Sequence, residues 1–85
     1  MMTLLKLRKG EFSVVEEKVH PEAVVVGKMV KDIELPQACV LVAILRKGNL
    51  LVPRGETVFQ SVDEVIALVH ASHVSELAAL LGKAS

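Results

Sequence analysis

The sequence has few of the residues that nucleic-acid-binding proteins rely on. Its 85 residues include two phenylalanines and no tryptophan or tyrosine, and 10 basic side chains balance 10 acidic ones. A neutral chain with scattered basic residues lacks the electrostatic footprint of a DNA- or RNA-binding protein. Two aromatic rings also cannot form a platform on which bases stack. We therefore expect no nucleic-acid partner.

Cysteine and long hydrophobic runs are scarce as well. The single cysteine, Cys39, excludes an internal disulfide and a multi-cysteine zinc site. The longest apolar run, residues 38–45, is far shorter than the roughly 20 residues that cross a bilayer. No signal-peptide pattern is visible in the first ten residues. These features lead us to expect a cytoplasmic protein.

What the chain does have is an excess of apolar side chains for its size. Hydrophobic residues make up 52% of the sequence, and the mean hydropathy is +0.50. A domain this small buries only about 60–65% of the surface that its unfolded chain exposes. The excess predicts that one face is covered by a partner, most simply a second copy.

The first half of the chain predicts a strand followed by a short helix. We expect residues 1–10 to be a flexible segment and residues 11–19 to form the opening strand, which Pro21 ends. Val26, Met29, Val30 and Ile33 then recur at spacings of three and four, which is typical of one helical face. This N-terminal helix would be about two turns long and would stop at Pro36.

The second half predicts paired strands and a closing helix. Residues 38–45 are eight consecutive apolar residues, typical of a strand buried on both faces. Gly48 and Asn49 can adopt the positive φ of a tight hairpin to a strand at residues 50–52. A brief extended piece at 57–59, a strand over 64–70 and a helix over 74–81 follow. The predicted fold is α+β, with a mainly antiparallel sheet and helices at either end.

No arrangement of residues in the sequence indicates catalysis. His70 and His73 lie at the end of a strand and the start of a helix, so they do not share a face for a metal. Cys39 lies in the apolar strand, where a buried thiol is inert. Asp63 and Glu64 are adjacent on a predicted strand and point to opposite faces, so they do not form an acid/base pair. We expect no enzyme, metal or cofactor.

Four segments, taken in order, resemble the TrkA C-terminal domain, also called the C-terminal RCK domain. They are VGKMVKDIELP at residues 26–36, VAILRKG at 42–48, LVPRGETV at 51–58 and SVDEVI at 61–66. The resemblance covers residues 14–82. The sequence departs from the family at Val62, where the family usually has glycine before the aspartate.

The resemblance implies that residues 11–85 are a regulatory domain of a potassium or other cation transport system. Its expected partners are a second copy, a nucleotide-binding N-terminal RCK domain and a membrane transporter or channel subunit. The domain would therefore associate peripherally with a membrane complex. In some members of the family the dimer interface binds a small ligand such as cyclic di-AMP.

By position, the resemblance places a candidate ligand groove at the dimer interface, from the end of the first helix into the long strand. Glu34 would repel a phosphate there, and Val40 offers a base edge no polar group, so both count against cyclic di-AMP. Met29 and Ile33 also fit simple packing between two copies. The groove residues are Met29, Asp32, Ile33, Glu34 and Val40.

Two other functions stay open at this stage. One is a free-standing small-molecule sensor of the ACT type, which is also a small α+β dimer. The other is a purely structural interaction domain that binds no ligand. A ligand that binds only the folded state raises the melting temperature, so a thermal shift separates the sensors from the structural domain.

Overall fold

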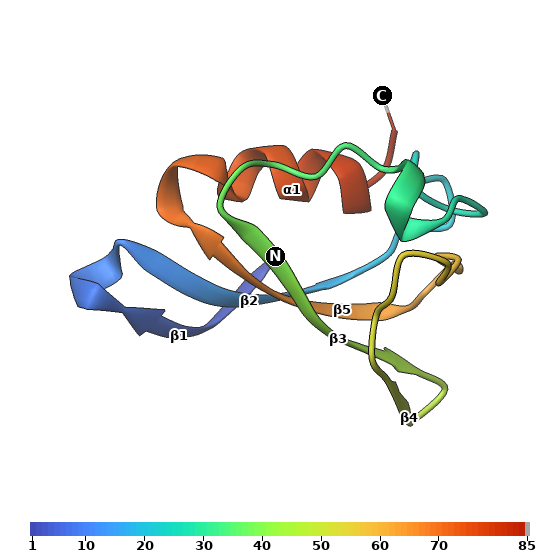
Figure 1. Ribbon diagram of the computed structural model, residues 1–85, viewed down its shortest axis with the longest axis horizontal. Coiled ribbons are helices and arrows are strands. Elements are labelled where there is room, and N and C mark those ends of the chain that lie inside the picture. Colours follow the sequence, from blue (N-terminus) through green and yellow to red (C-terminus); the bar gives the residue numbers. More distant parts are fainter. Residues whose placement is uncertain (85) are drawn as a thin grey trace.

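Five strands form one antiparallel sheet in a computed structural model that describes residues 1–84. They are β1 (Met2–Leu7), β2 (Phe12–Lys18), β3 (Cys39–Arg46), β4 (Asn49–Leu51) and β5 (Glu64–His70). Their order across the sheet is β1-β2-β5-β3-β4. Helix α1 (Val74–Leu81) and the long connection between β2 and β3 lie on the same side of this sheet (Figure 1). The predicted α+β class with an antiparallel sheet and a C-terminal helix is confirmed.

Residues 1–10 contain a strand where we expected a flexible segment. Strand β1 pairs with β2 in antiparallel register and lengthens the sheet by one edge strand. A 3-10 turn, η1 (Arg8–Gly10), joins the two strands. All six residues of β1 are exposed, so its pairing with β2 holds the strand in place and burial of its side chains does not.

The N-terminal helix predicted around Val26–Ile33 does not form. Only a single 3-10 turn, η2 (Val30–Asp32), occurs there. Some of the backbone donors that a helix would use are bonded to a distant segment: Gly27 N–H donates to the carbonyl of Phe59 and Val30 N–H to that of Thr57, each at 2.9 Å. Pairing with a distant extended segment thus replaces some of the local helical hydrogen bonds. The spacing of Val26, Val30 and Ile33 reflects their packing against the core and not a helix.

The β3–β4 hairpin turns on two residues with positive φ. Lys47 (φ 52°) and Gly48 (φ 79°) occupy the two central positions between the paired residues Arg46 and Asn49. Positive φ at both positions is the geometry whose twist matches that of the flanking strands. We had assigned this conformation to Gly48 and Asn49, so the turn lies one residue earlier than predicted.

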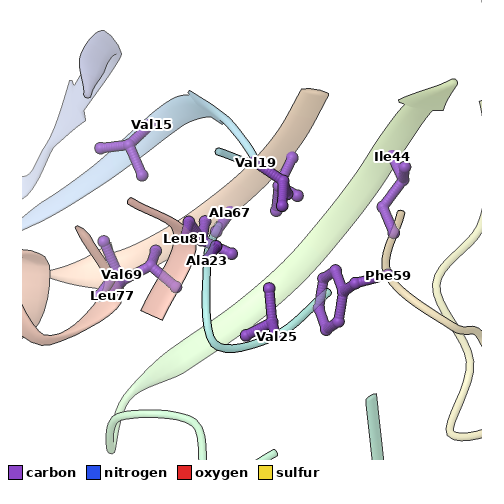
Figure 2. Close-up of a cluster of buried hydrophobic side chains, with 11 residues drawn as sticks. Val15, Val19, Ala23, Val25, Ile44, Phe59, Ala67, Val69, Leu77 and Leu81 are labelled. Carbon is purple, nitrogen blue, oxygen red and sulfur yellow. The ribbon is translucent and has the colours of Figure 1, made fainter. Parts of the chain in front are cut away.

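The core lies between the sheet and the elements above it (Figure 2). Leu77 and Leu81 of α1 belong to one buried cluster with inward residues of β2, β5 and β3, and Phe59 and the β2–β3 connection complete it. The inward positions of β5 are small or β-branched, which leaves room for the helix. The buried apolar residues are Val15, Val19, Ala23, Val25, Ile44, Phe59, Val65, Ala67, Val69, Leu77 and Leu81.

Strand β3 is buried on one face only, contrary to the sequence prediction. Cys39 and Leu41 pack against the core, whereas Val40 and Val42 are 59% and 50% exposed. The alternation is that of an antiparallel strand with one covered face. A run of eight apolar residues carries no periodic signal, so it could not distinguish this case from burial on both faces.

Candidate functional site

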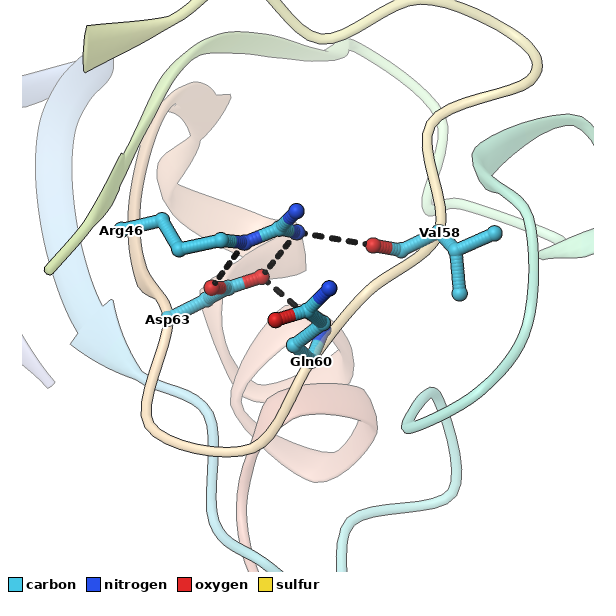
Figure 3. A network of polar contacts seen from close by, with 4 residues as sticks. All are labelled: Arg46, Val58, Gln60 and Asp63. Atoms are coloured by element: carbon cyan, nitrogen blue, oxygen red, sulfur yellow. Dashed lines mark hydrogen bonds and ion pairs between the residues drawn. The ribbon is translucent and has the colours of Figure 1, made fainter. Parts of the chain in front are cut away.

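An ion pair joins the β3–β4 hairpin to the turn that precedes β5 (Figure 3). Arg46 Nε and Nη2 donate to Asp63 Oδ1 and Oδ2, each at 2.9 Å, so the contact is bidentate. Arg46 Nη2 also donates to the carbonyl of Val58 at 2.8 Å, and Gln60 N–H donates to Asp63 Oδ2 at 2.9 Å. Because Asp63 is buried, this pair holds three segments in a fixed relation.

The charges of this pair shift both pKa values in the direction that keeps the pair ionised. Burial alone would raise the pKa of Asp63. The hydrogen bonds from Arg46 and Gln60 N–H, with the charge of Arg46, outweigh it and hold the pKa below its usual value. The hydrogen bond to Asp63 raises the pKa of Arg46. Asp63 is thus a structural carboxylate, not a proton donor near neutral pH.

Hydrogen bonds connect the ion pair of Arg46 and Asp63 to the segment around η2, where the ligand groove was predicted. Val58, whose carbonyl accepts from Arg46, forms an isolated antiparallel bridge with Met29. Lys31 N–H donates to the carbonyl of Gly55 at 2.9 Å, which extends that contact toward η2. Residues 55–59 therefore connect the ion pair to the backbone of η2.

The structure does not bring the five predicted groove residues together within one copy. Ile33 packs against the core on the α1 side of the sheet, next to the exposed carboxylates of Asp32 and Glu34. Val40 points to the opposite face, because its neighbours Cys39 and Leu41 face the core. A groove that contains all five residues would have to be completed by a second copy.

A separate open hollow lies beside the start of β1, the end of β2 and the start of β5. Its volume is about 510 Å³, and it is lined by Met1, Met2, Glu16, Glu17, Lys18 and Glu64. Its three carboxylates outnumber Lys18 and the N-terminal amine, and the amine pairs with Glu17 at 2.8 Å, so the hollow has a small excess of negative charge. None of the predicted groove residues lies there.

His70, His73 and Cys39 lie on the elements where the sequence placed them. His70 ends β5, and its Nδ1 accepts from Ser72 N–H at 3.1 Å; His73 Nδ1 lies 3.0 Å from Glu76 Oε1 on α1. Burial raises the pKa of the Cys39 thiol. Among residues 1–84, no three His, Cys, Asp or Glu side chains converge as a metal site would require. In the same residues, no helix has the length and apolarity needed to cross a membrane.

Sequence reasoning missed the open face of the sheet as a candidate functional surface. Val40 pairs with Leu68, and Leu68 pairs with Val14, so these outward residues form one row across three strands. The row continues to Leu5 on β1, which pairs with Val14. Because both faces of β3 are apolar, only the observed register reveals which residues remain uncovered.

The comparisons with known proteins identify the family. The family model of the TrkA-C domain matches residues 14–82. The chain belongs to this family. The match begins within β2, so the edge strand β1 lies outside it.

Relatives with curated descriptions are Trk system potassium uptake proteins. A TrkA homolog of Archaeoglobus fulgidus is 32% identical over 73 residues, covering 86% of this chain and 17% of the relative. TrkA homolog 1 of Methanosarcina mazei is 23% identical over 74 residues, covering 87% of this chain and 18% of the relative. The chain thus spans less than a fifth of these proteins.

A solved structure described as an RCK domain with cda has the same fold. It superposes with a TM-score of 0.67 at 19% identity and covers 79% of this chain and 97% of its own. The likeness supports the sheet-and-helix architecture described above. The match of the TrkA-C family model confirms the predicted family.

Proposed function

We propose that this chain is a cytosolic domain that dimerises and regulates a potassium transport system, with a small ligand bound between its two copies. The family match over residues 14–82 carries the proposal, supported by relatives that are Trk potassium uptake proteins. These relatives are several times longer than the chain. A nucleotide-binding N-terminal RCK domain and a membrane transporter or channel subunit are therefore proposed as its partners, attached to the membrane complex peripherally.

The mechanism would be linkage between ligand binding and the orientation of the two copies. A ligand that contacts both copies stabilises one relative orientation, and the attached transport machinery responds to that preference. A coupling of about 1–3 kcal/mol changes an equilibrium roughly 5- to 150-fold. The ion pair of Arg46 and Asp63 supports this role, because Arg46 also donates to the carbonyl of Val58, which bridges to Met29 and so connects the pair to the segment of η2.

The proposed ligand contacts are Met29, Asp32, Ile33 and Glu34 around η2, with Val40 supplied across the interface. Asp32 and Glu34 are both exposed, so they add negative charge to this end of the molecule. Lys28 and Lys31 are exposed on the same segment and balance these charges, so any repulsion of a phosphate is local to the two carboxylates. The case against a cyclic dinucleotide therefore rests on Glu34 and on the apolar Val40, not on the charge of the whole segment.

A thermal-shift screen of the 85-residue chain tests this proposal, with cyclic dinucleotides, nucleosides and amino acids as probes. A ligand that binds only the folded state at 100 times its Kd adds about 2.7 kcal/mol of stability, which a melting curve resolves easily. We expect Glu34→Lys to change the shift caused by any charged ligand. Glu76→Lys, which alters an exposed carboxylate on α1, is the matched control and should leave the shift unchanged.

The outcomes separate the candidate functions. A shift from one probe that Glu34→Lys alters supports a ligand-sensing domain and identifies its input. A shift confined to an amino acid and indifferent to residue 34 would replace the proposal with an ACT-like sensor. A dimer that no probe stabilises would contradict ligand sensing and leave a structural interaction domain.

A further inference from the structure

Strand β1 is one of the two edges of the sheet, and none of its side chains belongs to the core cluster (Figure 1). All six of its residues are exposed, and β2 is its only partner strand. Its large apolar side chains leave between 38% and 59% of their surface uncovered. Because burial of apolar surface is the main contribution to folding stability, β1 is held chiefly by its backbone hydrogen bonds. These side chains are Met2, Leu4, Leu5 and Leu7.

The opposite edge strand, β4, is anchored to the body of the domain. Leu51 packs against the core, and Arg46, which precedes the β3–β4 turn, forms a bidentate contact with the buried Asp63. Detaching β4 would therefore break core contacts and disturb an ion pair. No β1 side chain packs against the core in this way, so the two edges differ in how easily they separate from the sheet.

The ladder between β1 and β2 is short and interrupted. Its register shifts between Thr3 and Leu5, so Leu4 has no opposite residue and the pairing is locally irregular. Outside the ladder, the amine of Met1 pairs with Glu17 Oε2 at 2.8 Å and ties the first residue to the end of β2. Strand β1 is thus held along five paired residues and by this contact at its start.

The turn that holds β1 against β2 requires an unfavourable backbone conformation. Arg8, Lys9 and Gly10 have φ values of 51°, 58° and 90°. Glycine adopts such values freely, but in Arg8 and Lys9 they bring each Cβ close to the carbonyl oxygen that follows. The strain exists only while the turn is closed, because a detached strand lets both residues return to extended conformations. The turn therefore favours detachment.

We propose that β1 is a strap that detaches from the edge of β2 as one unit, while β2, β5, β3 and β4 stay folded. The TrkA-C match begins at residue 14, within β2, so the strap lies outside the matched domain and does not depend on the proposed function. Detachment frees the hydrogen-bonding edge of β2 for another extended segment. It also removes Met1 and Met2 from the wall of the hollow beside Glu16, Glu17 and Glu64.

Native-state hydrogen exchange of the full 85-residue chain, followed by NMR, tests this inference within a single strand. Successive N–H groups of β2 point alternately to β1 and to β5. Those that face β1 should exchange at least about 100-fold faster than those that face β5, and their rates should barely change in low urea, since detachment exposes little surface. If both sets exchange at one rate with one urea dependence, β1 leaves only when the whole domain unfolds, and the inference is wrong.

Two glycine variants separate detachment of β1 from global unfolding. Lys9→Gly relieves strain in the β1–β2 turn and should slow exchange of the β1-facing amides roughly threefold, an effect reduced by the greater freedom of glycine in the detached strand. Lys47→Gly is the matched control, because Lys47 has a similar φ of 52° in the β3–β4 turn, and it should leave those amides unchanged. An equal response to both variants would mean that the β1-facing amides report global stability, and it would contradict the inference. An absent or opposite response to Lys9→Gly would contradict it as well.

Discussion

The two faces of the β-sheet carry the same kinds of apolar side chain but differ in what covers them. On the inner face, Val65, Ala67 and Val69 of β5 are buried in the core cluster that also contains Leu77 and Leu81 of α1. On the outer face of the same strand, Ile66 and Leu68 are only partly buried, and their neighbours Val40 and Val42 are exposed. The difference teaches that composition indicates how much apolar surface must be covered, whereas topology decides which part the chain covers by itself. Substitutions on the two faces should therefore affect different equilibria.

The largest effect should follow from removing the helix anchor on the inner face. Leu77 is fully buried, so Leu77→Ala should lower the free energy of unfolding by about 3–5 kcal/mol, through lost burial and a new cavity. Leu50→Ala on the outer face, where Leu50 is 68% exposed, should change it by less than about 0.5 kcal/mol in dilute monomer. Urea unfolding of both variants measures this contrast. Equal losses would show that the two faces do not differ as described.

The adjacent carboxylates Asp63 and Glu64 lie on opposite faces of the sheet, so they allow the two faces to be compared for charged side chains. Asp63 points inward to Arg46, so Asp63→Asn leaves the guanidinium without its charged partner and should cost about 3 kcal/mol. Glu64 points outward, and Glu64→Gln should cost less than about 0.5 kcal/mol. Chemical denaturation at neutral pH checks both values. A larger loss at Glu64 than at Asp63 would contradict the assigned orientations.

The same ion pair predicts how stability depends on pH. The pKa of Asp63 is lowered by folding, so its contribution is complete above the usual carboxyl value of about 3.9 and is lost as pH falls through the lower folded value. The wild type should therefore lose stability in acid more steeply than Asp63→Asn, which has no carboxyl to protonate at this position. Unfolding free energies measured at several pH values below neutral provide the test. If the free energies of unfolding of the wild type and Asp63→Asn fall in parallel as the pH is lowered, protonation of Asp63 does not contribute to the loss of stability in acid.

Much of this architecture could be predicted from the sequence, for identifiable reasons. Pro21 ends one strand and Gly48 lies in the turn that ends another. The three-and-four spacing of Val74, Leu77 and Leu81 predicts α1. As a result β2, β3, β5 and α1 were predicted within a few residues. The helix predicted around Met29 failed because Val58 pairs with it from a distance, which no local pattern records.

The candidate surfaces were less predictable than the fold. The buried partner of Arg46 lies 17 positions away, and nothing in either local segment indicates that Asp63 turns inward to meet it. The outer face was hidden because Val40 and Val42 resemble Cys39 and Leu41 in polarity. Register between distant strands decides both features, and a single sequence does not contain that register explicitly.

The smallest effect concerns the turn that sets Asp63 on the inner face. Val62 has a φ of 61°, which a β-branched residue adopts only at a cost of about 1–2 kcal/mol. Two backbone hydrogen bonds hold it there, from Val62 N–H to the carbonyl of Val19 and from Val19 N–H to that of Asp63. Because its side chain is 55% exposed, little burial is lost on truncation.

Val62→Gly should therefore stabilise the domain by about 1 kcal/mol, the strain relieved less the greater entropy of glycine in the unfolded chain. Val62→Ala keeps the Cβ that disfavours positive φ and should gain less. Melting temperatures and denaturant midpoints of the two variants rank these effects. If alanine stabilised as much as glycine, β-branching rather than the left-handed backbone would be the source of the strain. If glycine destabilised, the Val62 side chain would hold the turn, and with it the inward direction of Asp63, through contacts of its own.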